Sequence, residues 1–303
     1  MQPQKIITRI GIGLSAQMLL YQLFGALALS LSYLLLPPDI AQANWVLWTC
    51  NYVPYYLIAV PTMLLIFRTI PDSELVPQGK RKLTAKHFLL LLLACWGISG
   101  TLGFVSNLIV MLFEVIKGAP LSSTESLEAM MAEPWLYFFI STICAPLMEE
   151  YVFRYLLFKK LARFGGKSYV LLSAFVFALS HANLSQMLYA FAIGMVLAAL
   201  YYFSRNVWHV IALHMTFNFV GGTVLVLLSS YASMTVTMIW SLLTLGCIIA
   251  GCITGISWWN RHKQDIFFLP GEVALSKRMV FRNSGMILFM AIIAALVVLG
   301  IVL

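Results

Sequence analysis

The sequence predicts an all-α, polytopic integral membrane protein, a helical bundle of about nine transmembrane helices. Of the 303 residues, 61% are hydrophobic and only 10% are charged, whereas soluble domains carry roughly 25% charged residues. Apolar runs near the length of about 20 residues that spans a bilayer as a helix recur along the chain. Eight helices are the alternative, because the fifth and sixth runs are short. We expect a single membrane domain over residues 1–303 and no soluble domain.

Nine apolar segments account for these helices. They cover approximately 11–36, 44–67, 88–113, 134–158, 169–183, 186–203, 207–229, 233–259 and 284–303. The first follows Lys5 and Arg9 and exceeds the roughly 7–15-residue apolar region of a signal peptide, so we expect it to be retained. Pro54 and Pro61 predict bends in the second segment and Pro146 in the fourth, because proline removes a backbone donor.

The third and eighth segments carry glycines at helical spacing. Gly97, Gly100 and Gly103 lie in the third segment, and Gly251 and Gly255 lie in the eighth. Small residues at such spacing are typical of helices that pack closely in a membrane. We therefore expect these glycines to mark close helix contacts.

The fourth, fifth and seventh segments differ from the others because they carry ionisable side chains. Glu149 and Glu150 are adjacent in the fourth segment with Arg154 one turn later, and His181 and His214 lie in the fifth and seventh. An ionised carboxylate near the bilayer centre costs several kcal/mol unless it is paired or faces water. These residues are candidates for a functional site inside the membrane.

The distribution of basic residues predicts the orientation of the chain. If the N-terminus is cytoplasmic and the segments alternate, every Lys and Arg except Lys117 and Arg154 falls on the cytoplasmic side. This asymmetry is the positive-inside pattern. The formal net charge of +8 is then a topology signal, with attraction to the lipid bilayer as a side effect, and we expect no nucleic-acid partner.

Helical geometry separates the roles of the two glutamates. Residues four apart share a helix face, whereas neighbours diverge by about 100°. Glu150 and Arg154 can therefore pair, although such a pair can also be purely structural. Glu149 has no ionisable residue three or four positions away, and it suits general-base work on water.

The four-residue spacing recurs in two other segments. Phe177 and His181 are four apart in the fifth segment, and His214 and Asn218 are four apart in the seventh. At about 1.5 Å per helical residue, Glu149 and these three polar side chains lie at similar depths. They can meet in one cavity if their helices converge.

Taken in order, the three motifs resemble the signature of the CAAX protease and bacteriocin-processing (CPBP) family, which includes the type II prenyl-protein CAAX endopeptidases. The motifs are Glu149-Glu150-x-x-x-Arg154, Phe177-x-x-x-His181 and His214-x-x-x-Asn218. The resembling core covers about 134–229, roughly a third of the chain. The resemblance implies a polytopic intramembrane glutamic endopeptidase.

The resemblance also implies a role for each motif. Glu149 would activate the attacking water with help from His181. His214 and Asn218 would form the oxyanion site for the tetrahedral intermediate. The residues that would support the site are Glu150, Arg154 and Phe177.

We expect no cofactor. The HExxH motif of many zinc proteases is absent, and we favour metal-independent chemistry. If a metal were bound, Glu149, His181 and His214 would be a plausible set of ligands.

The substrate and two other classes of function stay open. A prenylated or other membrane-associated protein, or a small hydrophobic peptide such as a bacteriocin precursor, would fit a cavity nearer the cytoplasmic side, so bacteriocin processing or immunity is among the expected roles. The alternatives are a catalytically idle scaffold or regulator of the same fold and, less favoured, a proton-coupled transporter, since intramembrane Glu and His also form proton relays. The short N-terminus and the lack of a targeting domain suggest the bacterial cytoplasmic membrane.

Overall fold

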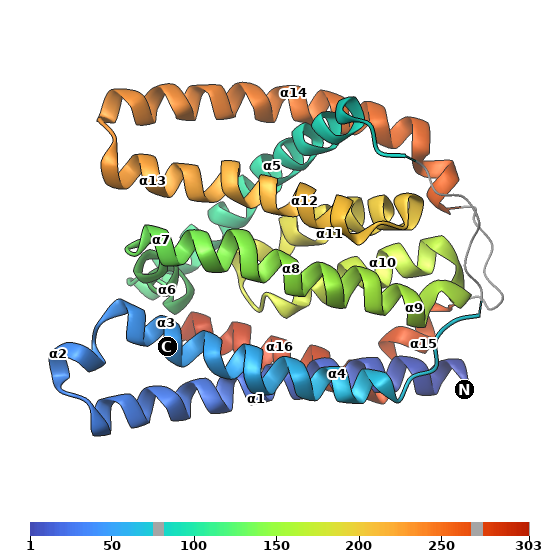
Figure 1. The fold of residues 1–303 in the computed structure, drawn as a ribbon, viewed down its shortest axis with the longest axis horizontal. Coiled ribbons are helices and arrows are strands. Elements are labelled where there is room, and N and C mark those ends of the chain that lie inside the picture. The colour runs from blue at the N-terminus through green and yellow to red at the C-terminus, as the bar shows by residue number, and fades with distance from the viewer. Residues whose placement is uncertain (75–81, 268–274, 303) are drawn as a thin grey trace. The chain divides into compact units, whose positions relative to one another are not determined.

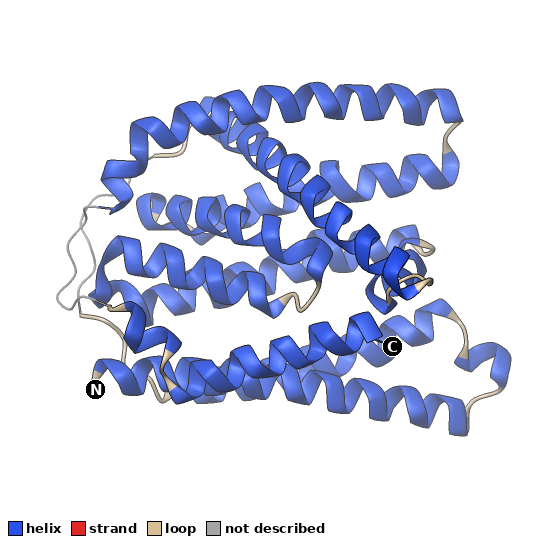
Figure 2. Ribbon diagram, turned by 180° about the vertical axis from the view of Figure 1, so that it is seen from behind, coloured by secondary structure: helices blue, strands red, loops and turns tan. Residues whose placement is uncertain are grey.

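The computed structural model describes residues 1–74, 82–267 and 275–302, and all regular secondary structure in this part of the chain is helical (Figures 1 and 2). The helices form two compact units. The first comprises Met1–Asp72, Ser122–Leu136 and Leu275–Leu303, and the second comprises Ser73–Leu121 and Tyr137–Ala274. All the predicted site residues lie in the second unit.

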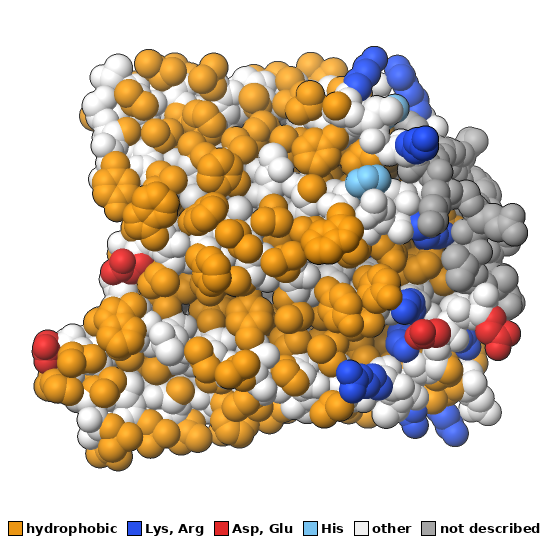
Figure 3. All heavy atoms as spheres, in the orientation of Figure 1, with side chains coloured by type: hydrophobic (Ala, Val, Ile, Leu, Met, Phe, Trp, Pro, Cys, Tyr) orange, Lys and Arg blue, Asp and Glu red, His pale blue; other side chains and the backbone are white. Residues whose placement is uncertain are grey.

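Eight helices of the described residues are long and apolar enough to cross a membrane. They are Pro3–Leu35, Asn44–Arg68, Ala85–Lys117, Pro134–Ser180, Leu184–Ser204, Val207–Tyr231, Met234–Arg261 and Ser284–Val302. Large apolar side chains on these helices stay exposed, as lipid-facing residues do; Leu242 and Ile253 are examples. Figure 3 shows hydrophobic side chains over the visible faces of both units, with most of the visible Lys and Arg side chains near one end of the helices of each unit. The predicted all-α polytopic membrane bundle is confirmed.

The first unit is built around α1 and its neighbours. Its helices are α1 (Pro3–Leu35), α2 (Pro38–Ala41), α3 (Asn44–Pro54), η1 (Tyr55–Ala59), α4 (Val60–Arg68), α6 (Ser122–Met131), α15 (Lys277–Phe281) and α16 (Ser284–Val302). Asn283 links α1 to α16, because its amide donates to the Gln4 carbonyl at 3.1 Å while its oxygen accepts the Gly285 N–H at 3.1 Å. The short α7 (Pro134–Tyr137) precedes the second unit's longest run of helix.

The second unit carries the candidate site. Its helices are α5 (Ala85–Lys117), η2 (Phe138–Cys144), α8 (Ala145–Glu149), η3 (Glu150–Leu156), α9 (Leu157–Leu161), η4 (Ala162–Phe164), α10 (Gly165–Ser180), α11 (Leu184–Ser204), α12 (Val207–Asn218), η5 (Phe219–Thr223), α13 (Val224–Tyr231) and α14 (Met234–Phe267). The segments η2, η3 and η5 are π-helical turns within longer helices.

The 47-residue helical run Pro134–Ser180 is folded back on itself. A 3₁₀ turn at Ala162–Phe164 leads into Gly165, whose φ of +82° suits glycine because it has no Cβ. After this turn α10 runs back beside η3 and α9 (Figure 1), and Phe158 packs edge-on against Tyr169 with ring centroids 5.0 Å apart. The run therefore contains the predicted fourth segment (134–158) and all but the last three residues of the predicted fifth (169–183).

Prolines and π-helical turns occur together. Pro61 and Pro146 each lie two residues after a π-helical segment, η1 and η2 respectively. Proline has no N–H, and its ring clashes with the carbonyl of the preceding turn in a regular α-helix. A wider turn relieves this conflict. The bends predicted at these prolines correspond to this local change in helix type.

The glycines of α5 and α14 form a close helix contact. A Cβ on Gly251 would clash with the carbonyl of Leu93, and a Cβ on Gly97 would clash with the backbone of Gly251. At Gly255 a Cβ would make only ordinary contact, 3.6 Å from Cβ of Ala94. The predicted close packing is confirmed at Gly97 and Gly251.

Candidate active site

The two glutamates lie where one helix type changes to another. Glu149 is the last residue of α8, and Glu150 is the first residue of the π-helical segment η3. The Glu150 side chain is fully buried, whereas 20% of the Glu149 side chain is exposed. Glu149 is thus the carboxylate that a substrate or water can reach.

Glu150 joins two partners from different helices. Its Oε2 lies 3.0 Å from Nε of Arg154, so the ion pair predicted from the four-residue spacing is present, and both side chains are fully buried. Its Oε1 lies 2.7 Å from Nδ1 of His214 on α12. The second contact was not expected from the sequence, because no spacing rule relates residues on separate helices.

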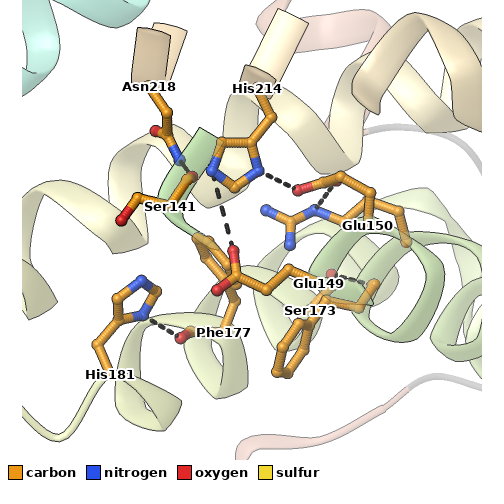
Figure 4. Close-up of polar contacts among 10 residues, drawn as sticks. Ser141, Glu149, Glu150, Ser173, Phe177, His181, His214 and Asn218 are labelled. Carbon is orange, nitrogen blue, oxygen red and sulfur yellow. Dashed lines mark hydrogen bonds and ion pairs between the residues drawn. The ribbon is translucent and has the colours of Figure 1, made fainter. Parts of the chain in front are cut away.

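His214 faces both glutamates (Figure 4). Its Nε2 lies 3.9 Å from Oε2 of Glu149, on the opposite side of the ring from the contact with Glu150. Glu149 and Glu150 therefore converge on one imidazole, although the sequence led us to expect that Glu149 would point away from the Glu150–Arg154 pair. Two features account for the difference. A π-helical segment starts at Glu150, and the His214 ring lies between the two carboxylates.

His181 and Phe177 lie at the end of α10, beside this cluster. Nδ1 of His181 lies 2.8 Å from the carbonyl oxygen of Phe177. A carbonyl only accepts hydrogen bonds, so Nδ1 carries the hydrogen and Nε2 of the neutral ring is an acceptor. The Phe177 ring packs edge-on against His181 and lies 4.1 Å from the guanidinium carbon of Arg154. Phe177 thus separates His181 from the buried ion pair.

Asn218 is held by a backbone carbonyl that lies within a π-helical turn. Its Nδ2 donates to the carbonyl of Ser141 in η2 at 2.8 Å. Thr142 directly follows Ser141, and its hydroxyl oxygen lies 2.8 Å from that of Thr223 in a buried bond that joins η2 to η5. One Nδ2 hydrogen of Asn218 stays available for another acceptor.

Sequence reasoning missed three residues that contact the site. They are Ser141, Tyr169 and Ser173, and each contact involves a backbone carbonyl. Every residue has a carbonyl, so neither residue type nor motif spacing indicates which one accepts. The only available signal is that Tyr169 and Ser173 precede Phe177 by eight and four residues on the same helix.

The candidate metal ligands are not arranged as a metal site. Across the described ranges, no group of three or more His, Cys, Asp or Glu side chains is placed to hold a metal ion. Glu149 and His214 are neighbours, and Nε2 of His181 has a free lone pair, so the donor atoms are of a suitable kind but are not brought together as one set. The set of Glu149, His181 and His214 therefore does not fit a metal in the present geometry.

The arrangement offers the groups that peptide hydrolysis requires. A partly exposed carboxylate, Glu149, can accept a proton from water. His214 supplies a nitrogen atom 3.9 Å from it, Asn218 follows His214 by one turn of α12, and Glu150 holds the histidine from the other side of the ring. Such an arrangement can promote attack on a carbonyl and stabilise the charge that develops on its oxygen.

Comparison with known proteins points to membrane peptidases. Residues 130–220 match the family described as type II CAAX prenyl endopeptidase Rce1-like. A curated relative, "Putative membrane peptidase YdiL" of Bacillus subtilis (strain 168), is 27% identical over 175 residues, which cover 54% of this chain and 66% of the relative. The chain thus matches slightly less than two thirds of that relative's length. No solved structure matches the chain.

Proposed function

We propose that the chain is an intramembrane endopeptidase of the CAAX protease family, whose model residues 130–220 match, and that it hydrolyses a peptide bond with glutamate-activated water. The observation that carries the proposal is the convergence of Glu149 and Glu150 on His214 inside the second unit. A structural ion pair would need only Glu150 and Arg154. It would not need a second, partly exposed carboxylate at the same imidazole.

In the proposed mechanism, Glu149 accepts a proton from the attacking water. His181 shares this task through Nε2, which is free to accept because Nδ1 serves the Phe177 carbonyl. As water attacks the peptide carbonyl, Asn218 and His214 donate to the developing oxyanion. The proton held by Glu149 then passes to the leaving amine, so the carboxylate is regenerated.

We propose that the substrate is a membrane-associated protein or a small hydrophobic peptide. The helices that carry the site are apolar and span the membrane, so a substrate reaches Glu149 by way of the lipid bilayer or its surface. Prenylated proteins and bacteriocin precursors are both substrates that could reach the site from the bilayer or its surface. The cytoplasmic side of a bacterial membrane is the proposed side of entry, because the basic residues indicate that side.

The test uses detergent-purified protein and quenched fluorescent peptides, some of them farnesylated. Wild type is compared with Glu149→Gln, which keeps the shape of the side chain and removes the base, and with His181→Ala. The exposed Glu128 supplies a matched control, Glu128→Gln. Each protein is assayed with and without a strong chelator.

We expect wild type and Glu128→Gln to cleave, with or without chelator, and Glu149→Gln to lose activity by at least about 10²–10⁴-fold, the usual contribution of a general base. Cleavage that a chelator abolishes would contradict the metal-independent mechanism. Equal cleavage by Glu149→Gln would exclude this residue as the base. Absence of cleavage by all four folded proteins would favour a scaffold role.

A further inference from the structure

Four side chains at four-residue spacing form a row along one face of α10. They are Tyr169, Ser173, Phe177 and His181. Residues four apart lie on the same face of a helix, so the motif Phe177-x-x-x-His181 continues for two further turns toward the start of α10. Tyr169 and Ser173 have no part in the mechanism described above.

Both hydroxyl groups of this row donate to the backbone of η3. Ser173 Oγ donates to the carbonyl of Phe153 at 2.6 Å (Figure 4), and Tyr169 Oη donates to the carbonyl of Arg154 at 3.3 Å. Ser173 and Tyr169 are completely buried. Buried polar groups are costly to leave without a hydrogen bond, so each contact strongly favours the present position of α10 against η3.

Phe177, the third member of the row, contacts the side chains of the same two residues. Its ring lies 4.1 Å from the guanidinium carbon of Arg154 and packs edge-on against Phe153, with centroids 5.4 Å apart. The row thus holds two consecutive residues of η3 by both backbone and side chain. This contact is independent of the bond between Glu150 and His214.

The helix type of η3 matters for the site because the two ends of the segment have different partners. Glu150, at its start, contacts His214 on α12, whereas Arg154 contacts Phe177 on α10. A π-helical turn has one more residue than an α-helical turn and can convert to it by a shift of register. One residue corresponds to about 100° of rotation in an α-helix. Such a shift would prevent Arg154 and Glu150 from meeting both partners together.

We propose that Tyr169 and Ser173 are positioning residues that hold η3 in its π-helical register and thereby fix Glu150 for its contact with His214. The expected effect of these two residues on turnover rests on the proposed function. Their effect on the surroundings of His214 can be measured without a substrate. The two consequences can therefore be measured separately.

The first measurement is nuclear magnetic resonance of protein labelled with ¹⁵N at its five histidines, with His214 assigned from the signals lost in His214→Gln. Ser173→Ala and Tyr169→Phe each remove one hydroxyl from the row. Ser180→Ala is the matched control, because Ser180 lies on the same helix but donates to its own helix, at the Val176 carbonyl 2.8 Å away. We expect the His214 ring signals to move in Ser173→Ala and Tyr169→Phe and to stay in place in Ser180→Ala. Unmoved His214 signals in both row variants would overturn the proposal.

Rescue and turnover separate positioning from general loss of stability. Ser173→Thr keeps a hydroxyl and should return the His214 signals toward their wild-type positions. If Ser173→Ala fails to fold, Tyr169→Phe decides the question, since it keeps the ring that packs against Phe158. If a peptide substrate is found, we expect Ser173→Ala and Tyr169→Phe each to lower kcat about tenfold and to leave KM little changed. One hydrogen bond accounts for an effect of this size.

The outcomes also distinguish this inference from the proposed function. Moved His214 signals in a protein that cleaves nothing would contradict the peptidase proposal and support the positioning role. Unmoved signals, in a protein whose cleavage depends on Glu149, would contradict the positioning role alone.

Discussion

His214 is the residue on which both glutamates of the first motif converge, and its hydrogen positions follow from these neighbours. An ionised carboxylate only accepts hydrogen bonds, so Nδ1, 2.7 Å from Oε1 of Glu150, must carry a hydrogen. A neutral imidazole then has a lone pair on Nε2 and cannot donate from it. To donate to an oxyanion, His214 has to be doubly protonated, and the two flanking carboxylates are the groups that such an imidazolium needs. The oxyanion role proposed for His214 thus depends on Glu150 as well.

The buried ion pair leads to a prediction about stability. Arg154→Gln leaves the Glu150 carboxylate fully buried without its cation, and we expect the free energy of unfolding to fall by about 3–5 kcal/mol. The double variant Glu150→Gln/Arg154→Gln removes both charges and should recover a large part of this loss. Thermal unfolding in detergent measures the stability of the single and the double variant. Lys5→Gln, at an exposed residue, is the control. A double variant as unstable as Arg154→Gln would contradict the argument.

Residue spacing predicted the contacts that lie within one helix and missed those that join two. The Glu150–Arg154 pair followed from four-residue spacing, and it is present at 3.0 Å. The approach of Glu150 and Glu149 to His214 did not follow, because the distance between two helices depends on packing across the whole unit. The hydrogen bonds from Asn218 and Ser173 to backbone carbonyls could not be predicted for the same reason.

At the scale of the element, the π-helical segments are the features that sequence reasoning described least well. Pro146 explains η2, and the pair Gly221–Gly222 lies within η5, but η3 contains neither proline nor glycine. The segment η3 carries Glu150 and Arg154, and its carbonyls accept hydrogen bonds from α10. Tertiary contacts rather than local sequence therefore account for the π-helical form of η3, which is why a regular helix was expected there.

The contact between α5 and α14 predicts a difference between two glycines of one helix. Gly251→Ala would place a methyl group against the Leu93 carbonyl, whereas Gly246→Ala meets no atom within 4 Å. We expect Gly251→Ala to lower the free energy of unfolding by about 1–3 kcal/mol, the usual cost of overpacking, and Gly246→Ala to leave it nearly unchanged or raise it. Thermal unfolding of the two variants in the same detergent provides the comparison. Similar losses in both would contradict the close contact as the cause.

At the scale of the whole molecule, hydrophobicity predicted most of the helical architecture. Apolar runs of sufficient length located the spans, since a bilayer tolerates only segments whose backbone is internally hydrogen-bonded. The reversal between 158 and 169 was also recognised, and Gly165 makes it sterically feasible. Division of the helices into two compact units was not foreseen, because it depends on which helices touch and not on the composition of any one of them.

The orientation in the membrane remains a prediction, and it can be tested at both sides. Moving Lys and Arg across a membrane is unfavourable, so the basic loops should remain cytoplasmic. Gln2 and Ala119 are exposed residues on opposite predicted sides and can be replaced by cysteine without removing a charge. In intact bacterial cells, a membrane-impermeant maleimide should label Ala119→Cys and leave Gln2→Cys unlabelled until the cells are opened. Wild type, whose five cysteines lie in apolar segments, is the control for background labelling. The reverse pattern would place the N-terminus outside the cytoplasm and move the proposed entry side of the substrate with it.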